Sequence, residues 1–415
     1  MSRNLRQDAL TIIKESIRHV LPDNAVKQKL AELNLSRVVL VSIGKAAWRM
    51  AKAAKEVLKE KIEKGIVITK YGHSEGDIEG LEIYEAGHPV PDENTIRATE
   101  RALEIVKDLS GEDTVLLLIS GGGSSLFEKP KGSVTLSQLQ SITDQLLKSG
   151  ANIEEINAVR KHLSEVKGGR FAQKIFPARV VCLILSDVLS NRLDVIASGP
   201  AHPDSSSSED ALNVIKKYGV RVDENVLKEL KDETPKSLSN VESHIVADLK
   251  IACEKAVEVA ERLGYRAEIL TTSLDCEARE AGFFVGSIAK ELALHDRPLK
   301  KPCALVLGGE TVVRVKGTGK GGRNQELALA AAMKIENLDD VVVCSVGTDG
   351  TDGPTDAAGG IVDGKTVQRI RDAGFDPEEF LENNDSYRAL KFSNDLLITG
   401  PTGTNVNDLI LILAR

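Results

Sequence analysis

The sequence predicts a two-domain α/β protein whose sheets are covered by helices. Strand-like runs alternate with helical patterns along the whole chain. The runs, such as RVVLVSI at 37–43 and RVVCLIL at 179–185, are continuously apolar, as in parallel strands buried on both faces. The length of 415 residues exceeds what one hydrophobic core usually serves. Together these features favour a doubly wound parallel sheet with a second domain.

The first half of the chain contains the clearest alternation of strands and helices. Strands are predicted at 37–43, 64–69, 81–85, 114–120 and 179–185, and helices at 1–21, 45–61, 94–109 (capped by Asn94), 136–149 and 153–159. A polar stretch at 203–210 predicts an exposed loop or a helix start, and residues 231–240 have linker-like composition. We therefore expect a larger, Rossmann-like doubly wound domain at residues 1–240.

The second half, residues 241–415, predicts a smaller α/β domain. Strands are expected at 244–246, 266–270, 304–307, 311–315, 341–346, 396–399 and 408–413, and helices at 249–263, 277–294 and 324–333.

Composition excludes several classes of protein. The net charge of −8 argues against nucleic acid as a partner. No apolar stretch approaches the roughly 20 residues of a membrane span, and no signal peptide is visible, which predicts a cytoplasmic protein. The five cysteines contain no C-x-x-C pair, so neither a disulfide framework nor a structural zinc site is indicated. The oligomeric state is left open, with a homodimer as one option.

Unusual residues of the first half follow predicted strands, where open α/β sheets bind ligands. Lys45 stands between a strand and a helix, which suits an anion, with a solvated surface lysine as the alternative. The run Ser120-Gly121-Gly122-Gly123-Ser124-Ser125 lets backbone N–H groups converge on an oxyanion, unless it is a plain turn. Asp187 can bind Mg²⁺, accept a hydroxyl proton, or only cap a turn. His73, His202 and His244 do not cluster with Cys or Glu at metal-ligand spacing, and His88 lies in a polar, glycine-flanked context, which favours structural or substrate-facing roles for the histidines.

Two loops of the second half combine glycine with charge. Lys320 and Arg323 lie in a glycine-rich loop at a helix start, an electrostatic match for a phosphoryl group. No Walker A motif is present, because Gly321 follows Lys320. The loop at 347–360 contains three aspartates but has Gly360 where an EF-hand needs glutamate, so a Mg²⁺–nucleotide site fits better than a calcium site.

Nine blocks, in order along nearly the whole chain, resemble the glycerate 2-kinases of the MOFRL type. They are GKAA (44–47), GHPVPDENT (87–95), SGGGSSL (120–126), NAVRKHLSEVKGGR (157–170), LSDV (185–188), IASGP (196–200), GGETVV (308–313), GKGGRNQELAL (319–329) and GTDGTDGPTDAAGG (347–360). The resemblance implies transfer of the ATP γ-phosphoryl group to the 2-hydroxyl of D-glycerate, with Mg²⁺, giving 2-phosphoglycerate and ADP. It also implies an active site in the cleft between the two domains.

The resemblance also implies roles for individual residues. Lys45, Arg323 and Asp187 become the catalytic candidates, the first two as cations that stabilise the transferred phosphoryl group. Substrate or phosphate binding is implied for Ser120, Gly121, Gly122, Gly123, Ser124, Ser125, Arg160, Lys320, Gly321, Gly322 and Asn324. Glu310, Asp349 and Asp352 become candidate metal ligands. One departure is visible at residues 189–192, which read LSNR where many relatives carry a Pro-Gly-Asp-Asp-like turn, so this turn lacks the carboxylates that would bind a metal.

The main alternative is an NAD(P)-dependent reductase of hydroxypyruvate or a related small keto acid. Gly317, Gly319 and Gly322 fit the G-x-G-x-x-G spacing of a dinucleotide-binding turn. Such a turn requires an acidic residue at the end of the next strand, but Asp340 precedes that strand and Asp349 comes too late. This disfavours the reductase. A non-catalytic module that binds small anions is a third alternative.

Overall fold

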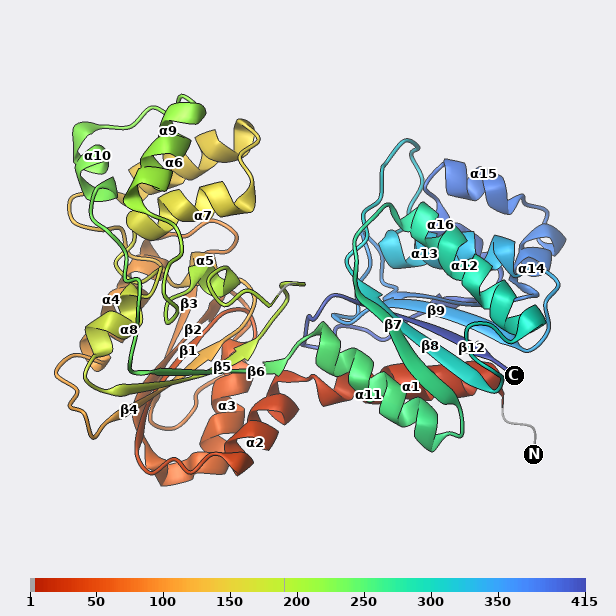
Figure 1. The fold of residues 1–415 in the computed structure, drawn as a ribbon, viewed down its shortest axis with the longest axis horizontal. Coiled ribbons are helices and arrows are strands. Elements are labelled where there is room, and N and C mark those ends of the chain that lie inside the picture. The colour runs from red at the N-terminus through yellow and green to blue at the C-terminus, as the bar shows by residue number, and fades with distance from the viewer. Residues whose placement is uncertain (1–3, 190) are drawn as a thin grey trace. The chain divides into compact units, whose positions relative to one another are not determined.

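The computed structural model describes residues 4–189 and 191–415 and confirms the α/β class. Its contacts divide the chain into two compact units (Figure 1). The N-terminal unit is Pro22–Val246, and the C-terminal unit joins the segment up to Leu21 to Ala247–Arg415. Each unit is built around a six-stranded sheet of its own.

The sheet of the N-terminal unit has the strand order β3-β2-β1-β4-β5-β6, and the pairs among β1 to β5 are parallel. Its strands are β1 (Val38–Ile43), β2 (Ile62–Lys70), β3 (Leu81–Ala86), β4 (Thr114–Ile119), β5 (Arg179–Leu185) and β6 (Val241–Ala247). The order reverses direction between β1 and β4, so the ends of these two strands lie at a topological switch point.

Helices cover both faces of this sheet, as a doubly wound fold requires (Figure 1). They are α2 (Pro22–Glu32), α3 (Ala47–Leu58), α4 (Glu93–Ile105) and α8 (Arg170–Ile175). Val41 and Ile43 of β1 belong to one buried cluster with Ala98 of α4. Ser42, between them, faces the other side and donates to the carbonyl of Ala47 at the start of α3 at 2.8 Å.

A separate helical layer belongs to the same unit. It consists of α6 (Leu136–Lys148), α7 (Ile153–His162), α9 (Ser208–Lys217) and α10 (Glu224–Leu230), and its own buried cluster includes Leu139, Val159 and Val226. The polar stretch at 203–210 proves to contain a helix start, because Ser207 and Asp210 form a capping box for α9. The one-turn helix α5 (Gly123–Leu126) follows β4.

The sheet of the C-terminal unit is mixed, with the order β11-β10-β9-β12-β8-β7. Its strands are β7 (Arg266–Leu274), β8 (Cys303–Gly309), β9 (Val341–Gly347), β10 (Gly359–Asp363), β11 (Leu396–Leu397) and β12 (Asp408–Ala414). The last strand, β12, is inserted between β8 and β9 and runs antiparallel to both. Its first residue, Asp408, is therefore paired with Gly309 on one side and Gly347 on the other, where those strands end.

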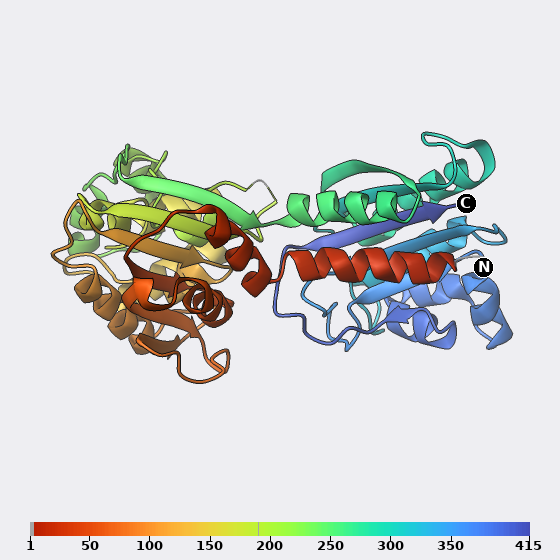
Figure 2. The ribbon, with the colours of Figure 1, turned by 90° about the horizontal axis from the view of Figure 1, so that it is seen from below.

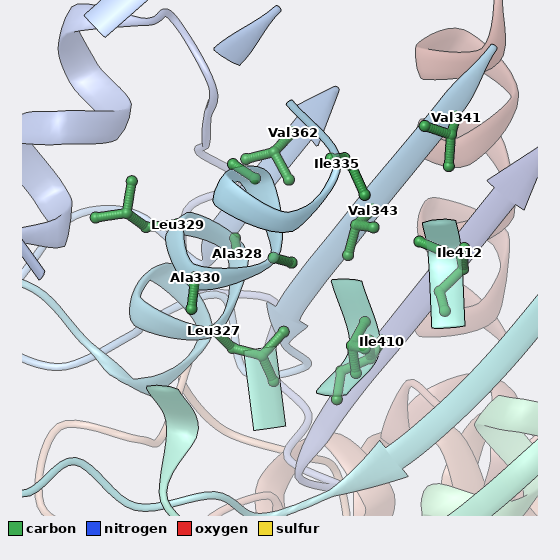
Figure 3. Close-up of a cluster of buried hydrophobic side chains, with 14 of the residues drawn as sticks. Leu327, Ala328, Leu329, Ala330, Ile335, Val341, Val343, Val362, Ile410 and Ile412 are labelled. Atoms are coloured by element: carbon green, nitrogen blue, oxygen red, sulfur yellow. The ribbon is translucent and has the colours of Figure 1, made fainter. Parts of the chain in front are cut away.

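Helices again cover both faces of the sheet. One face carries α1 (Leu5–His19) and α11 (Leu249–Arg262), which lie side by side (Figure 2). The other carries α12 (Ala278–His295), α13 (Arg323–Lys334), α14 (Thr366–Asp372), α15 (Pro377–Glu382) and α16 (Ser386–Phe392). Figure 3 shows α13 over β9 and β12, with Ala328, Val343 and Ile410 in one buried cluster. This core holds the start of α13 at a fixed place relative to the sheet.

The unit boundaries differ from the predicted division at residue 240 in two ways. The segment 244–246, expected to open the second domain, lies in β6, which pairs at the edge of the first sheet. The N-terminal helix α1 packs in the C-terminal unit: Arg6 pairs with Asp363 at 2.7 Å, and Thr404 donates to the carbonyl of Val20 at 2.8 Å. The apolar face of α1 indicates that the helix is buried on one side, but it does not identify the sheet that buries it.

Several local expectations need correction. Residues 311–315 do not form a strand, because only Val312 makes an isolated bridge, to Glu277. Helix α4 is capped by Asp92 rather than by Asn94, through a capping box with Thr95. The loop expected at 347–360 contains the start of β10, and α14, α15 and α16 were not predicted. None of the helices in the described ranges combines the length and apolar character that crossing a membrane requires.

Candidate functional site

The ends of β1 and β4 are joined at the switch point of the N-terminal unit. Gly44 follows β1 with φ 115°, and a Cβ on it would lie 2.3 Å from the Oγ of Ser120. Only glycine is therefore accommodated there. The amide of Lys45 donates to the carbonyl of Gly121 at 2.9 Å, and the amide of Ala46 donates to Ser120 Oγ at 3.0 Å. Lys45 and the loop at 120–125, predicted separately, are thus neighbours.

The turn formed by residues 120–126 presents free backbone donors. The amides of Gly123 and Ser125 bond within the turn, to the carbonyls of Ser120 and Gly122. The amides of Gly121, Gly122 and Ser124 have no acceptor within residues 4–189 and 191–415. Partly exposed amides without acceptors are the groups that bind a carboxylate or phosphate oxygen.

Three side chains line this turn. A Cβ on Gly122 would lie 2.9 Å from His88 Cδ2 and 3.2 Å from Lys45 Cγ, and a Cβ on Gly121 would lie 2.3 Å from Asp187 Oδ2. The Lys45 ammonium group has no hydrogen-bond or ion-pair partner in the described parts of the chain. Burial, and then the charge of Lys45, lower the pKa of His88, which favours the neutral imidazole. The sequence assigned His88 only a structural or substrate-facing role and did not make it a site candidate, although it lies in one of the resembling blocks.

A hydrogen-bonded layer supports the turn from behind. Ser124 Oγ bonds to Ser198 Oγ at 2.5 Å, and Ser198 donates to Asn157 Oδ1 at 3.2 Å. Ser198 has a left-handed backbone with φ 59°, which is strained for a residue other than glycine. Arg160, predicted to bind substrate, donates from Nη2 to the carbonyl of Ser124 at 2.9 Å. In this conformation Arg160 therefore fixes the turn.

In the C-terminal unit, Arg323 is held by two carboxylates. It donates to Asp408 from Nε at 2.6 Å and from Nη2 at 3.1 Å, and to Glu310 from Nη1 at 3.0 Å. Asp408 also accepts from Asn324 Nδ2 at 3.0 Å. Burial raises the pKa of Asp408 to about 6, because desolvation outweighs the stabilisation by Arg323. Asp408 was not predicted to be a site residue, because it stands alone at the start of a strand.

Asp352, a candidate metal ligand, caps helix α13 instead. Its Oδ1 accepts from the amide of Asn324 at 3.1 Å, and its Oδ2 accepts from the amide and side chain of Gln325, both at 2.9 Å. Burial of this carboxylate raises its pKa. The helix donors thus engage both oxygens of Asp352.

Much of the glycine-rich loop is closed by hydrogen bonds rather than open to a ligand. The amides of residues 316 and 317 donate to Asn384 Oδ1, that of Thr318 to Asn383 Oδ1, and that of Lys320 to Asp385 Oδ1. The amides at 321, 322 and 323 have no acceptor in the described ranges. The Lys320 ammonium lies over the ring of Tyr387, 5.0 Å from its centroid. The supporting segment at 383–387 carried no signal in the sequence.

The remaining metal candidates are half-exposed. Glu310 pairs with Arg323, and Asp349 accepts the amide of Thr351 at 2.9 Å. Within residues 4–189 and 191–415, no three His, Cys, Asp or Glu side chains come together as ligands for a metal ion.

Two family models match the chain. The domain of unknown function DUF4147 matches residues 8–231, and the MOFRL family matches residues 303–408.

Full-length relatives agree with these matches. The D-glycerate 2-kinase of Thermotoga maritima is 64% identical over 98% of each chain, and a crystal structure of glycerate kinase from that organism superposes with a TM-score of 0.98 over 99% of each chain. The glycerate 2-kinase of Pyrococcus horikoshii is 42% identical over 100% of this chain and 98% of its own length. A protein of Agrobacterium vitis, 40% identical over 98% of this chain and 94% of its own, is provisionally named a hydroxypyruvate reductase.

The capping role of Asp352 predicts a loss of stability on its removal. Asp352→Ala would leave the buried backbone amides of Asn324 and Gln325 without an acceptor, and we expect the free energy of unfolding to fall by about 2 kcal/mol. Chemical denaturation measures this change. Asp356→Ala, in the same loop but exposed, is the control and should cost less. Equal effects of the two substitutions would contradict the capping role.

Proposed function

Because the chain belongs to the family of glycerate 2-kinases that combine a DUF4147 domain with a MOFRL domain, we propose that it transfers the γ-phosphoryl group of ATP to the 2-hydroxyl of D-glycerate. The products are 2-phosphoglycerate and ADP. The observation that carries this proposal is the likeness, over nearly the whole chain, to the D-glycerate 2-kinase of Thermotoga maritima.

The turn at 120–126 of the N-terminal unit is suited to bind an oxyanion. The amides of Gly121, Gly122 and Ser124 supply directed donors, and the Lys45 ammonium adds a full positive charge beside them. In this proposal the turn binds the glycerate carboxylate or a phosphate group. In this proposal Asp187 and neutral His88, which line the same turn, contact the acceptor hydroxyl and its proton.

Arg323 of the C-terminal unit supplies charge for the phosphoryl group. Phosphoryl transfer needs positioned cations more than covalent chemistry. The two carboxylates that hold Arg323 orient its guanidinium before the substrate arrives, so little reorganisation is needed. In this proposal the amides of Gly321 and Gly322, with Lys320 and Asn324 nearby, complete the phosphate-binding surface of that unit.

Mg²⁺ fits the available carboxylates. This ion takes most of its ligands from phosphates and water, so one or two protein carboxylates are enough. Glu310 and Asp349 are half-exposed at the ends of β8 and β9, whereas Asp352 is engaged as a cap. Glu310 or Asp349 would therefore hold the ion, which when bound neutralises charge on the phosphate oxygens.

The reductase alternative receives little support from the geometry. A dinucleotide-binding turn offers its backbone amides to a pyrophosphate. Here the amides at 317–320 donate to Asn383, Asn384 and Asp385. A cytoplasmic location and the option of a homodimer stay predictions of the sequence.

The reaction is tested by phosphorus NMR of the product made from ATP, Mg²⁺ and D-glycerate. We expect a phosphate monoester on carbon 2, and ADP in equal amount. A product phosphorylated on carbon 3, or oxidation of NADH by hydroxypyruvate without use of ATP, would contradict the proposal.

Removal of either cation should slow the reaction without unfolding the protein. Lys45→Ala and Arg323→Ala each lose one preorganised charge, so we expect kcat to fall by roughly 10²-fold or more. Steady-state kinetics and the thermal midpoint are measured for each variant. Lys52→Ala, an exposed lysine of α3, is the control and should retain its activity. Full activity of the Lys45 or Arg323 variant would remove that residue from the proposed machinery.

Activity should fall as the pH decreases through about 6. Asp408, whose pKa is raised to about 6, is charged above that pH and holds Arg323, and protonation below it removes the charge that fixes the guanidinium. The pH profile of kcat/KM measures this decline in activity at acidic pH. Asp408→Asn should have a lower kcat/KM that does not decline at acidic pH, whereas Asp356→Asn should keep the wild-type profile. A wild-type profile that is flat through pH 6 would exclude this role of Asp408.

A further inference from the structure

A charged cluster is buried directly behind the turn at 120–126. The Lys167 side chain has no exposed surface, and neither does that of Glu128. The Lys167 ammonium donates to the carbonyl of Ser124 at 2.6 Å and to that of Phe127 at 2.8 Å, and it lies 3.1 Å from Glu128 Oε2. Glu128 also accepts from Ser164 Oγ at 2.6 Å. A buried lysine is rare unless its charge has a use or a partner.

The cluster carries an excess of positive charge. Arg160 is the second cation: it donates to the Ser124 carbonyl at 2.9 Å and lies 3.9 Å from Glu128. Lys167, Arg160 and Glu128 are the charged groups that act on one another here, so two cations face one carboxylate. Because the interior has a low dielectric constant, the charge that is not neutralised is felt strongly by nearby groups.

The geometry couples this charge to the open face of the turn. The two cations bind the carbonyl of Ser124, while the unoccupied amides of Gly121, Gly122 and Ser124 belong to the same short turn. The Ser124 carbonyl shares its peptide plane with the amide of Ser125, which donates to the carbonyl of Gly122, so fixing that plane holds the short turn that carries the open amides. Lys167 lies in the block at 157–170 and has no part in the phosphoryl transfer proposed for Lys45 and Arg323.

We propose that Lys167 is a positioning residue for anion binding. It fixes the peptide groups of the turn at 120–126, and the affinity of the turn for an oxyanion depends on whether the Lys167 side chain is protonated. The inference rests on the proposed function and deepens it. The oxyanion is the carboxylate of glycerate or a phosphate of ATP, and the experiment distinguishes these two sources.

The direction of the pH dependence follows from the surroundings of Lys167. Burial lowers its pKa to about 8, with Glu128 opposing the shift and Arg160 adding to it. An anion bound at the turn favours the charged ammonium group and so raises this pKa. By linkage, the anion binds with uptake of a proton near pH 8, and its affinity falls as the pH rises through about 8.

Kinetics of three variants test the positioning role. Lys167→Met keeps the length of the side chain but loses its charge, and we expect roughly a 10-fold rise in the KM of the substrate whose anion binds at the turn, with a smaller change for the other. Lys167→Arg, which keeps the charge, should recover part of this loss. Lys148→Met, on the exposed face of α6, is the control and should match the wild type. A uniform loss of activity that follows the loss of thermal stability would show a purely structural role and overturn the proposal.

Calorimetry of the wild-type protein tests the proton dependence without any variant. D-glycerate and, separately, inorganic phosphate are titrated in two buffers of different ionisation enthalpy, at pH values roughly one unit below and one unit above 8. We expect proton uptake and a lower affinity at the higher pH for the ligand that occupies the turn. Binding without proton uptake overturns the proposal even if Lys167→Met does not fold. Absence of phosphorylated product in the NMR experiment, by contrast, would refute the kinase reaction and leave the proton-linked binding of anions intact.

Discussion

The close approach of Gly44 to Ser120 is the constraint on which the N-terminal site depends. These residues follow β1 and β4, the two parallel strands at which the order of the sheet reverses. Crossovers leave such a pair in opposite directions, so the strand ends are left uncovered. The short contact joins the two turns and brings Lys45 beside the open amides of Gly121 and Gly122. The topology therefore creates the space, and the absence of side chains at the glycines keeps it open.

In the C-terminal unit, a different strand arrangement positions the candidate site residue Arg323. Its final strand, β12, enters between β8 and β9 in the antiparallel sense, so the start of one strand meets the ends of two others. Asp408 stands at that point and holds Arg323, which begins α13. Asp352 caps the same helix, and the core of α13 fixes the helix on the sheet. Asp408 thus holds the Arg323 side chain directly, while Asp352 and the core position the helix that Arg323 begins.

Local charge in the N-terminal site opposes the net charge of the protein. The chain carries −8 overall, yet Lys45, Lys167 and Arg160 surround or support a single turn that has open amides. Burial makes this arrangement effective, since charges removed from water interact more strongly and are screened less by salt. Glu128 and two carbonyl groups offset part of the energetic cost of burying Lys167.

The residue pattern alone predicted the α/β class, most strands, the strand-end loops, and the candidacy of Lys45, Ser120 to Ser125 and Arg323. Apolar runs indicate buried strands, and glycine next to charged residues indicates a loop that a ligand can approach closely. Both features are visible in short stretches of sequence. The tertiary structure was needed to show which sheet buries α1, that Asp352 caps a helix, that Asp408 pairs with Arg323, and that Lys167 lies behind the turn at 120–126. The reason is physical: these roles depend on partners distant in sequence, as Asp408 is from Arg323, and local periodicity carries no information about such partners.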